Sequence, residues 1–216
     1  MNFIYLNWTS ILVPFIAGIF NFRYFDKNLK IIFSFVCYGT ANEVFTRLLF
    51  WLADVKNAMP LLHLYGAISL GLLFAFYFYV LKSLIDKRIY LILTFVFFIY
   101  WVVNSLFIQS IFEYPSLPSS LGDILIILLS IMYFYKVMME AKIVKLADEP
   151  SIWINTAILI YYTGNLFFYI LFNNILEVSR EFSKITVYYY SALMALFYIL
   201  IAVGFLKARK RKPVSK

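Results

Sequence analysis

Cysteine, histidine and charged residues are scarce in this chain. The single cysteine, Cys37, excludes an intramolecular disulfide, and the single histidine, His63, excludes a histidine-rich metal site. Only 14% of the 216 residues are charged, against about a quarter in soluble domains. The sequence also contains no nucleophile elbow, phosphate-binding loop or dinucleotide fingerprint. We therefore expect no enzyme activity, no catalytic residues, and neither a cofactor nor a metal.

Apolar and aromatic side chains are abundant instead. Hydrophobic residues make up 64% of the chain and aromatic residues 21%, and the mean hydropathy is +0.86, which is typical of an integral membrane protein. Seven apolar stretches are long enough to cross a hydrocarbon core of about 30 Å. We expect an all-α fold in which 1–206 form one membrane domain. The predicted spans are 4–22, 31–52, 61–81, 89–111, 121–139, 151–172 and 185–206.

The basic residues are distributed unevenly between the two sides of the predicted membrane. Three Lys or Arg accompany each of the first, third and fifth loops, and six stand in the tail 207–216, which places fifteen on one side and four on the other. Because cytoplasmic loops carry the excess of basic residues, the N-terminus is predicted outside and the C-terminus inside. The acids show no such bias: with Glu43 within the membrane, five lie on each side. The formal charge of +8 thus reflects topology, and we expect the lipid bilayer as partner and no nucleic acid.

An internal repeat connects the second and sixth spans. The pattern Y-x-T-A-N-x-x-F, which begins at Tyr38, recurs as Y-x-T-G-N-x-x-F from Tyr161, 123 residues later. At the same offset the third and seventh spans also match. This predicts parallel repeats 1–88 and 121–206, joined by an inverting linker helix 89–111, which is a known plan of transporters.

The second span also carries an ion pair within its apolar sequence. Glu43 and Arg47 stand four residues apart with the acid first, the favourable order for a pair on a helix. Ionisable groups at membrane depth usually face a protein interior or a water-filled cavity, so we expect the pair to face such a cavity. The alternative is a purely structural ion pair.

Several other polar side chains fall in the outer half of the predicted membrane, where we expect one outward-facing pocket. The candidate ligand-binding residues are Asn42, Glu43, Arg47, His63, Tyr65, Asn104, Gln109, Asn165 and Tyr169. For the histidine, the alternative is a cap or hydrogen-bond donor at the membrane interface. For the asparagines, it is a bridge between helices.

Two polar stretches carry a resemblance, W-V-V-N-S-L-F-I-Q-S around Asn104 and Y-Y-T-G-N from Tyr161. With the seven spans, they make the whole chain similar to small, uncharacterised seven-helix bacterial membrane proteins, which implies a place in the inner (plasma) membrane and no particular activity. The 3+1+3 plan also resembles the sugar-transporter and PQ-loop architecture. The Pro-Gln pair diagnostic of those proteins is missing, since Pro14 precedes Phe15 and the fifth span has no proline.

Three functions are compatible with these features. The repeat favours a transporter-like protein that binds a small ligand, and this is our leading prediction. The outward bias of the polar groups favours a receptor-like sensor, which needs a separate cytoplasmic or membrane signalling partner, or a second copy of the chain. An intramembrane lipid-modifying enzyme is the third, and it would need an acid–base pair such as Glu43 with His63.

Overall fold

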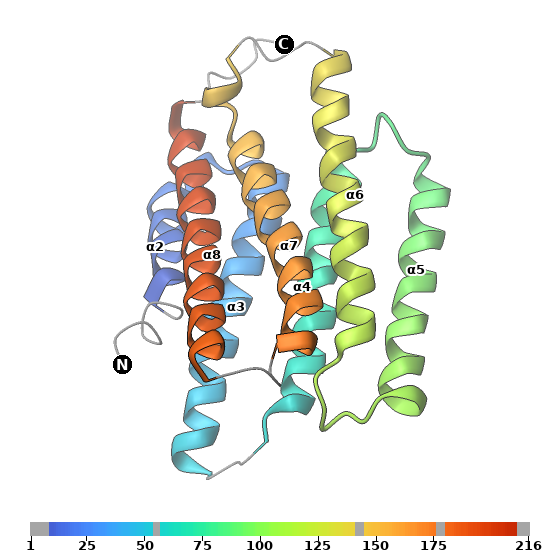
Figure 1. Ribbon diagram of the computed structural model, residues 1–216. Coiled ribbons are helices and arrows are strands. Elements are labelled where there is room, and N and C mark those ends of the chain that lie inside the picture. Colours follow the sequence, from blue (N-terminus) through green and yellow to red (C-terminus); the bar gives the residue numbers. More distant parts are fainter. Residues whose placement is uncertain (1–8, 54–56, 141–144, 176–179, 211–216) are drawn as a thin grey trace.

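The chain is helical along almost all of its described length (Figure 1). The computed structural model describes residues 9–53, 57–140, 145–175 and 180–210, and within them all side chains except those of 167–187 and 210. This part contains no strand, which confirms the all-α class. Its seven α-helices are α2 (Leu12–Asn21), α3 (Lys27–Leu52), α4 (Met59–Val80), α5 (Lys87–Val103), α6 (Ser116–Glu140), α7 (Pro150–Ile175) and α8 (Arg180–Lys207). Four short turns complete it: η1 (Phe22–Tyr24), η2 (Asn104–Ile108), η3 (Leu146–Asp148) and η4 (Ala208–Lys210).

Acidic caps and prolines set where several helices begin. Asp26 precedes α3 and accepts a hydrogen bond from the Leu29 N–H at 2.9 Å, and Asp86 caps α5 in the same way. Pro118 lies in the first turn of α6, where the missing N–H would have had no partner within the helix. Because proline is tolerated there, α6 begins five residues before the predicted span 121–139.

The helices form two layers of three, and α5 lies at one edge (Figure 1). In one layer α7 lies between α6 and α8, and in the other α3 lies between α2 and α4. Across the layers α2 packs on α8, α4 on α6, and α3 on α7. The helices α2, α4, α6 and α8 end, and α3, α5 and α7 begin, at one end of the bundle, here called the basic end. The opposite ends of these helices lie at the other end, here called the far end.

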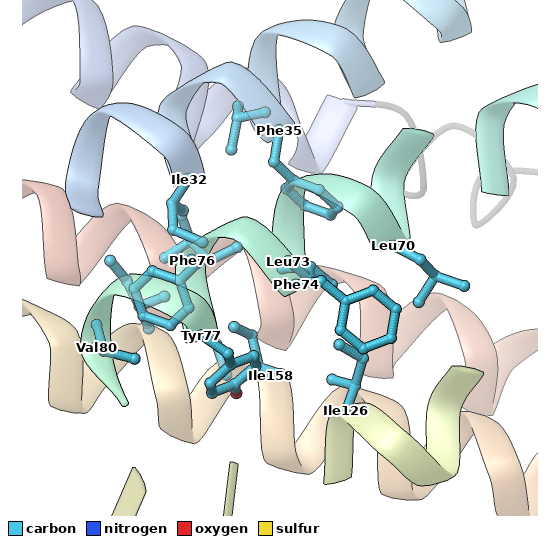
Figure 2. Packing of buried hydrophobic residues seen from close by; sticks show 14 of the residues in the cluster. Ile32, Phe35, Leu70, Leu73, Phe74, Phe76, Tyr77, Val80, Ile126 and Ile158 are labelled. Carbon is cyan, nitrogen blue, oxygen red and sulfur yellow. The ribbon is translucent and has the colours of Figure 1, made fainter. Parts of the chain in front are cut away.

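The core is centred on α4. The side chains of Phe76 and Tyr77 are completely buried there. Ile32 of α3, Ile126 of α6 and Ile158 of α7 reach the same cluster, so both layers meet on this helix (Figure 2). A change on this face of α4 therefore affects both layers together.

Within the part of the chain that the structure describes, four helices are long and apolar enough to cross a membrane. They cover Met59–Val80, Lys87–Ile108, Ser116–Glu140 and Tyr188–Lys207. A fifth apolar helix, Leu12–Tyr24, is shorter, and the beginning of the predicted span 4–22 lies outside the described residues. The α3 helix is absent from this group because Asn42, Glu43 and Arg47 interrupt its apolar sequence.

The contact between α7 and α8 depends on glycine. A Cβ atom at Gly204 would lie 2.9 Å from Ile154 Cγ1 and 3.1 Å from the Pro150 carbonyl oxygen, closer than atoms in ordinary contact. At Gly71 of α4, by contrast, the nearest atom to a Cβ would be Phe98 Cζ at 3.4 Å. Small residues let helices approach closely, and Gly204 allows this close approach between α7 and α8.

Candidate functional site

A cavity of about 170 Å³ lies between the two layers. Every helix from α3 to α8 contributes to its wall, together with the α5–α6 loop of the far end. The wall is strongly aromatic, and none of the described residues that line it is a Lys, Arg or His. Its tyrosines and tryptophan are Tyr65, Tyr114, Tyr161, Tyr162, Tyr190, Tyr198 and Trp101.

Asp123 is the one carboxylate among the described residues that line this cavity. The residue lies on α6 with 3% of its surface exposed. One carboxylate oxygen, Oδ2, accepts a hydrogen bond of 2.7 Å from Nδ2 of Asn165 on α7, which is itself buried. Among the described residues no cation forms an ion pair with Asp123. We call this hollow the Asp123 cavity.

Sequence reasoning missed Asp123. It counts this residue among the acids of the outer side, because Asp123 stands only three residues into the predicted span 121–139. Since α6 begins at Ser116, Asp123 instead lies in the second turn and points into the bundle. The available signal was Pro118 itself, because proline is a common residue in the first turn of a helix.

Hydroxyl groups add polar character to the aromatic wall. The hydroxyls of Tyr161 and Tyr190 lie 3.2 Å apart in a hydrogen bond between α7 and α8. The ring of Tyr65 stacks on that of Tyr38 with centroids 5.6 Å apart. Ser69 Oγ, buried one turn further along α4, has no hydrogen-bond partner among the described residues. The predicted residues Tyr65 and Asn165 thus lie in one site.

The Glu43–Arg47 pair lies elsewhere. Arg47 donates two hydrogen bonds to Glu43 Oε1, from Nη2 at 2.7 Å and from Nε at 3.0 Å. The two side chains are 48% and 39% exposed, for Arg47 and Glu43 respectively. Glu43 lines a separate groove of about 520 Å³ with Asn42 and Asn57, between α3 and the beginning of α4.

His63 is buried in a third place, where it joins three segments of the far end. Its Nδ1 lies 2.9 Å from Ser105 Oγ, and its Nε2 lies 2.9 Å from the carbonyl oxygen of Glu113. Both ring nitrogens therefore have partners, one on η2 and one in the α5–α6 loop. In this arrangement His63 fixes the loop to α4.

Asn104 and Gln109 hold the same loop from its other side. Asn104 donates from Nδ2 to Gln109 Oε1 at 2.9 Å, and Gln109 donates from Nε2 to Ser116 Oγ at 2.9 Å. The backbone N–H of Gln109 reaches back to the Asn104 carbonyl oxygen at 2.8 Å, which makes η2 a π-helical turn. Because Tyr114 and Pro115 of this loop line the Asp123 cavity, these contacts position part of its wall.

A further polar joint lies deeper in the bundle, toward the basic end. The Tyr77 hydroxyl donates to Asn155 Oδ1 at 2.8 Å, and Asn155 Nδ2 donates to the Ser130 carbonyl oxygen at 3.1 Å. Asn155 is completely buried. These bonds connect α4, α6 and α7 in the way that asparagine commonly bridges membrane helices.

The structure therefore distributes the predicted ligand-binding residues over three places. Tyr65 and Asn165 line the Asp123 cavity. On α3, Asn42 and Glu43 line the exposed groove, and Arg47 is paired with Glu43. His63, Asn104 and Gln109 form the far-end network. The side chain of Tyr169 lies outside the described residues.

The chemistry that this arrangement supports is binding. A single carboxylate, one amide and several hydroxyls offer hydrogen bonds and negative charge, and the rings offer aromatic surface. Among the residues that the structure describes, no three His, Cys, Asp or Glu side chains gather as a metal site would require. The chain matches no protein family, no curated protein and no solved structure.

Proposed function

We propose that this chain is a seven-helix integral membrane protein that binds a small ligand in the Asp123 cavity and carries it across the membrane. The observation that supports the proposal most is a carboxylate buried without a cationic partner among the described residues, at the wall of a cavity that six helices enclose. Burying a charged or polar group is unfavourable unless it is paired, so such a group is retained more readily for function than for stability.

The proposed membrane placement follows the charges and the apolar surface. Lys27, Lys82, Lys136 and Lys207 lie at or near the ends of helices at the basic end, which we assign to the cytoplasm. The α5 helix presents most of its apolar side chains outward, as a lipid-facing helix does. We infer an N-terminus outside, a C-terminus inside, and a place in a bacterial inner membrane.

The helix arrangement supports the 3+1+3 repeat and, with it, the transporter. The bounds of α3 and α7 differ by the 123 residues that separate the repeated motifs. A two-fold axis along the bundle would exchange α2 with α6, α3 with α7, and α4 with α8. It would therefore also exchange the α2–α8 contact with the α4–α6 contact, and both contacts occur. Asn42 and Asn165 differ in their surroundings, so the two halves have diverged at this position.

A receptor-like sensor is the second candidate. It is favoured by the place of the cavity, whose wall includes the α5–α6 loop at the far end, the proposed outer side. A sensor needs its ligand only on that side, whereas a carrier must open to both. The lipid-modifying enzyme has less support, because both ring nitrogens of His63 have hydrogen-bond partners and Glu43 lies in another groove.

Cysteine labelling tests whether the Asp123 cavity is an accessible site. Cys37 is the only cysteine, so a Cys37→Ser background allows single cysteines to be introduced. Ser119→Cys places a thiol at the cavity wall, and Ser130→Cys places one at a completely buried position outside it. We expect a membrane-impermeant thiol reagent added to intact spheroplasts to label the first and not the second. If the two variants resist labelling equally, the cavity is closed packing and the proposal is wrong.

Labelling from the two sides separates the carrier from the sensor. Ser83→Cys, an exposed position at the basic end, reports reagent that has reached the cytoplasm. In a carrier, the Ser119→Cys thiol is labelled by reagent added outside intact spheroplasts. It is also labelled by reagent added to the cytoplasmic side of the protein in inside-out vesicles. Labelling from the outside alone, together with copurification of a partner protein, would favour the sensor.

A further inference from the structure

The ligand of the Asp123 cavity can be narrowed by its charge. Asp123 receives a hydrogen bond from the neutral amide of Asn165, and no described Lys or Arg pairs with it. An amide supplies a hydrogen bond but no net positive charge. No basic residue among the described side chains lines the cavity, so among these an anionic ligand would meet a carboxylate and aromatic rings but no positive charge. The electrostatics therefore favour a cation.

The aromatic wall favours the same kind of ligand. The face of an aromatic ring carries a negative partial charge, which attracts ammonium groups within about 6 Å of the ring centre. The buried residues Tyr162, Tyr198 and Trp101 line the same cavity as the carboxylate. Aromatic side chains arranged in this way recognise alkylated ammonium groups better than they recognise strongly hydrated metal ions.

The size of the cavity limits the ligand further. Its volume of about 170 Å³ is below the roughly 300–1,000 Å³ typical of pockets for drug-sized ligands. About five or six water molecules occupy the same volume in liquid water, at roughly 30 Å³ each. The occupant is therefore a molecule of few non-hydrogen atoms.

We propose that the Asp123 cavity binds a small organic ammonium ion. Asp123 contacts the positive charge, Asn165 holds the carboxylate in place, and the tyrosine and tryptophan rings surround the alkyl groups. The inference rests on the proposed function, since it names the ligand class of the same site.

Choline and 3,3-dimethylbutan-1-ol are suitable probes, because they share shape and hydroxyl group and differ in charge. Binding of each to the purified protein in nanodiscs is measured by equilibrium dialysis and by the shift of the thermal unfolding midpoint. We expect choline to bind and to raise the midpoint. The neutral alcohol should bind at least about tenfold more weakly, because it lacks the positive charge that the carboxylate and the ring faces attract. Sodium chloride at the same concentration serves as the inorganic cation.

Asp123→Asn is the informative variant. It keeps the shape of the side chain and removes its charge, so choline binding should fall at least about tenfold while binding of the neutral alcohol changes little. Glu140→Gln is the matched control, since it makes the same change on the same helix at the basic end, where Glu140 contacts Ser83 and Lys136. Choline binding should be unchanged in this control.

Each other result has a definite meaning. Equal binding of choline and the neutral alcohol, or a stabilisation by sodium ions that choline does not reproduce, contradicts the ammonium inference and leaves a small-ligand site in place. Absence of binding by every probe also overturns the inference, and the cysteine labelling then decides on the proposed function by itself. The comparison of the two probes on the unchanged protein needs no variant, so it holds even if Asp123→Asn fails to fold.

Discussion

Replacing Gly204 by alanine tests how closely α7 and α8 pack. Carbon atoms in contact lie at least roughly 3.5 Å apart. The new Cβ would lie 2.9 Å from Ile154 Cγ1, about 0.6 Å too close, and 3.1 Å from the Pro150 carbonyl oxygen. The side chain of Ile154 has rotamers to change, but a backbone carbonyl in the first turn of α7 can move only with its helix. The two helices would therefore have to separate.

The expected loss follows from two opposing effects. Overpacking a close interface costs about 1–3 kcal/mol. The higher helix propensity of alanine offsets up to about 1 kcal/mol of this. We therefore expect Gly204→Ala to lower the free energy of unfolding by about 1–2 kcal/mol.

Gly71→Ala is the matched control for this experiment. It makes the same change in a helix interior, where the nearest atom to the new Cβ, Phe98 Cζ, lies at 3.4 Å, close to ordinary van der Waals contact. Its free energy of unfolding should stay within about 0.5 kcal/mol of the unchanged protein or rise slightly. Both variants are unfolded in bicelles with increasing dodecyl sulfate and followed by tryptophan fluorescence. If both alanines are equally neutral, α7 and α8 do not pack as closely as described.

Three further predictions concern stability, the exposed ion pair and topology. Asn155→Ala removes the acceptor of the buried Tyr77 hydroxyl of α4 and the side-chain donor to the Ser130 carbonyl oxygen of α6, and should destabilise the protein by about 1–3 kcal/mol in the same titration. Thr156→Val, whose hydroxyl donates within its own helix, should cost less than about 1 kcal/mol. Replacing Glu43 and Arg47 together by glutamine should change the free energy of unfolding by less than about 1 kcal/mol, because the pair is exposed. Once a ligand is identified, loss of its binding in this folded variant would show that the ligand site includes the Glu43–Arg47 pair. A reporter that functions only in the cytoplasm should be active when it is fused after Lys216. Activity of a reporter that functions only on the outer side would contradict the proposed orientation.

The existence and extent of most helices follow from the sequence, because long apolar stretches have few other ways to satisfy their backbone hydrogen bonds. The all-α class and most of the helix ends were predictable on this basis. The rotation of each helix about its axis was not. When apolar residues surround a helix, hydrophobicity does not show which face meets the protein, and packing decides. Asn165 and Asn42 stand in matching motifs, yet only Asn165 faces the cavity.

The candidate site was predictable in part for the same reason. Tyr65 and Asn165 could be placed near each other from the direction of their spans. Asp123 could not, because the predicted span began at 121, five residues after the observed beginning of α6, and so left the carboxylate at the membrane edge. Glu43 drew attention as the charged group in mid-span, but α3 exposes it. Charge in an apolar segment identifies unusual residues without showing what surrounds them.

The π-helical turn at the end of α5 has a consequence for the length of the chain. A π turn holds one residue more than an α turn, so η2 is equivalent to a single-residue insertion in a straight helix. Deleting one residue such as Leu106, which is exposed, would make Gln109 the fourth residue after Asn104, the one whose N–H bonds to the same carbonyl in an α turn. Gln109 would then keep its place beside Ser116, which it now contacts. The wall of the cavity on this side therefore tolerates the loss of one residue from η2, whereas in a straight helix such a deletion would rotate the following residue by about 100°.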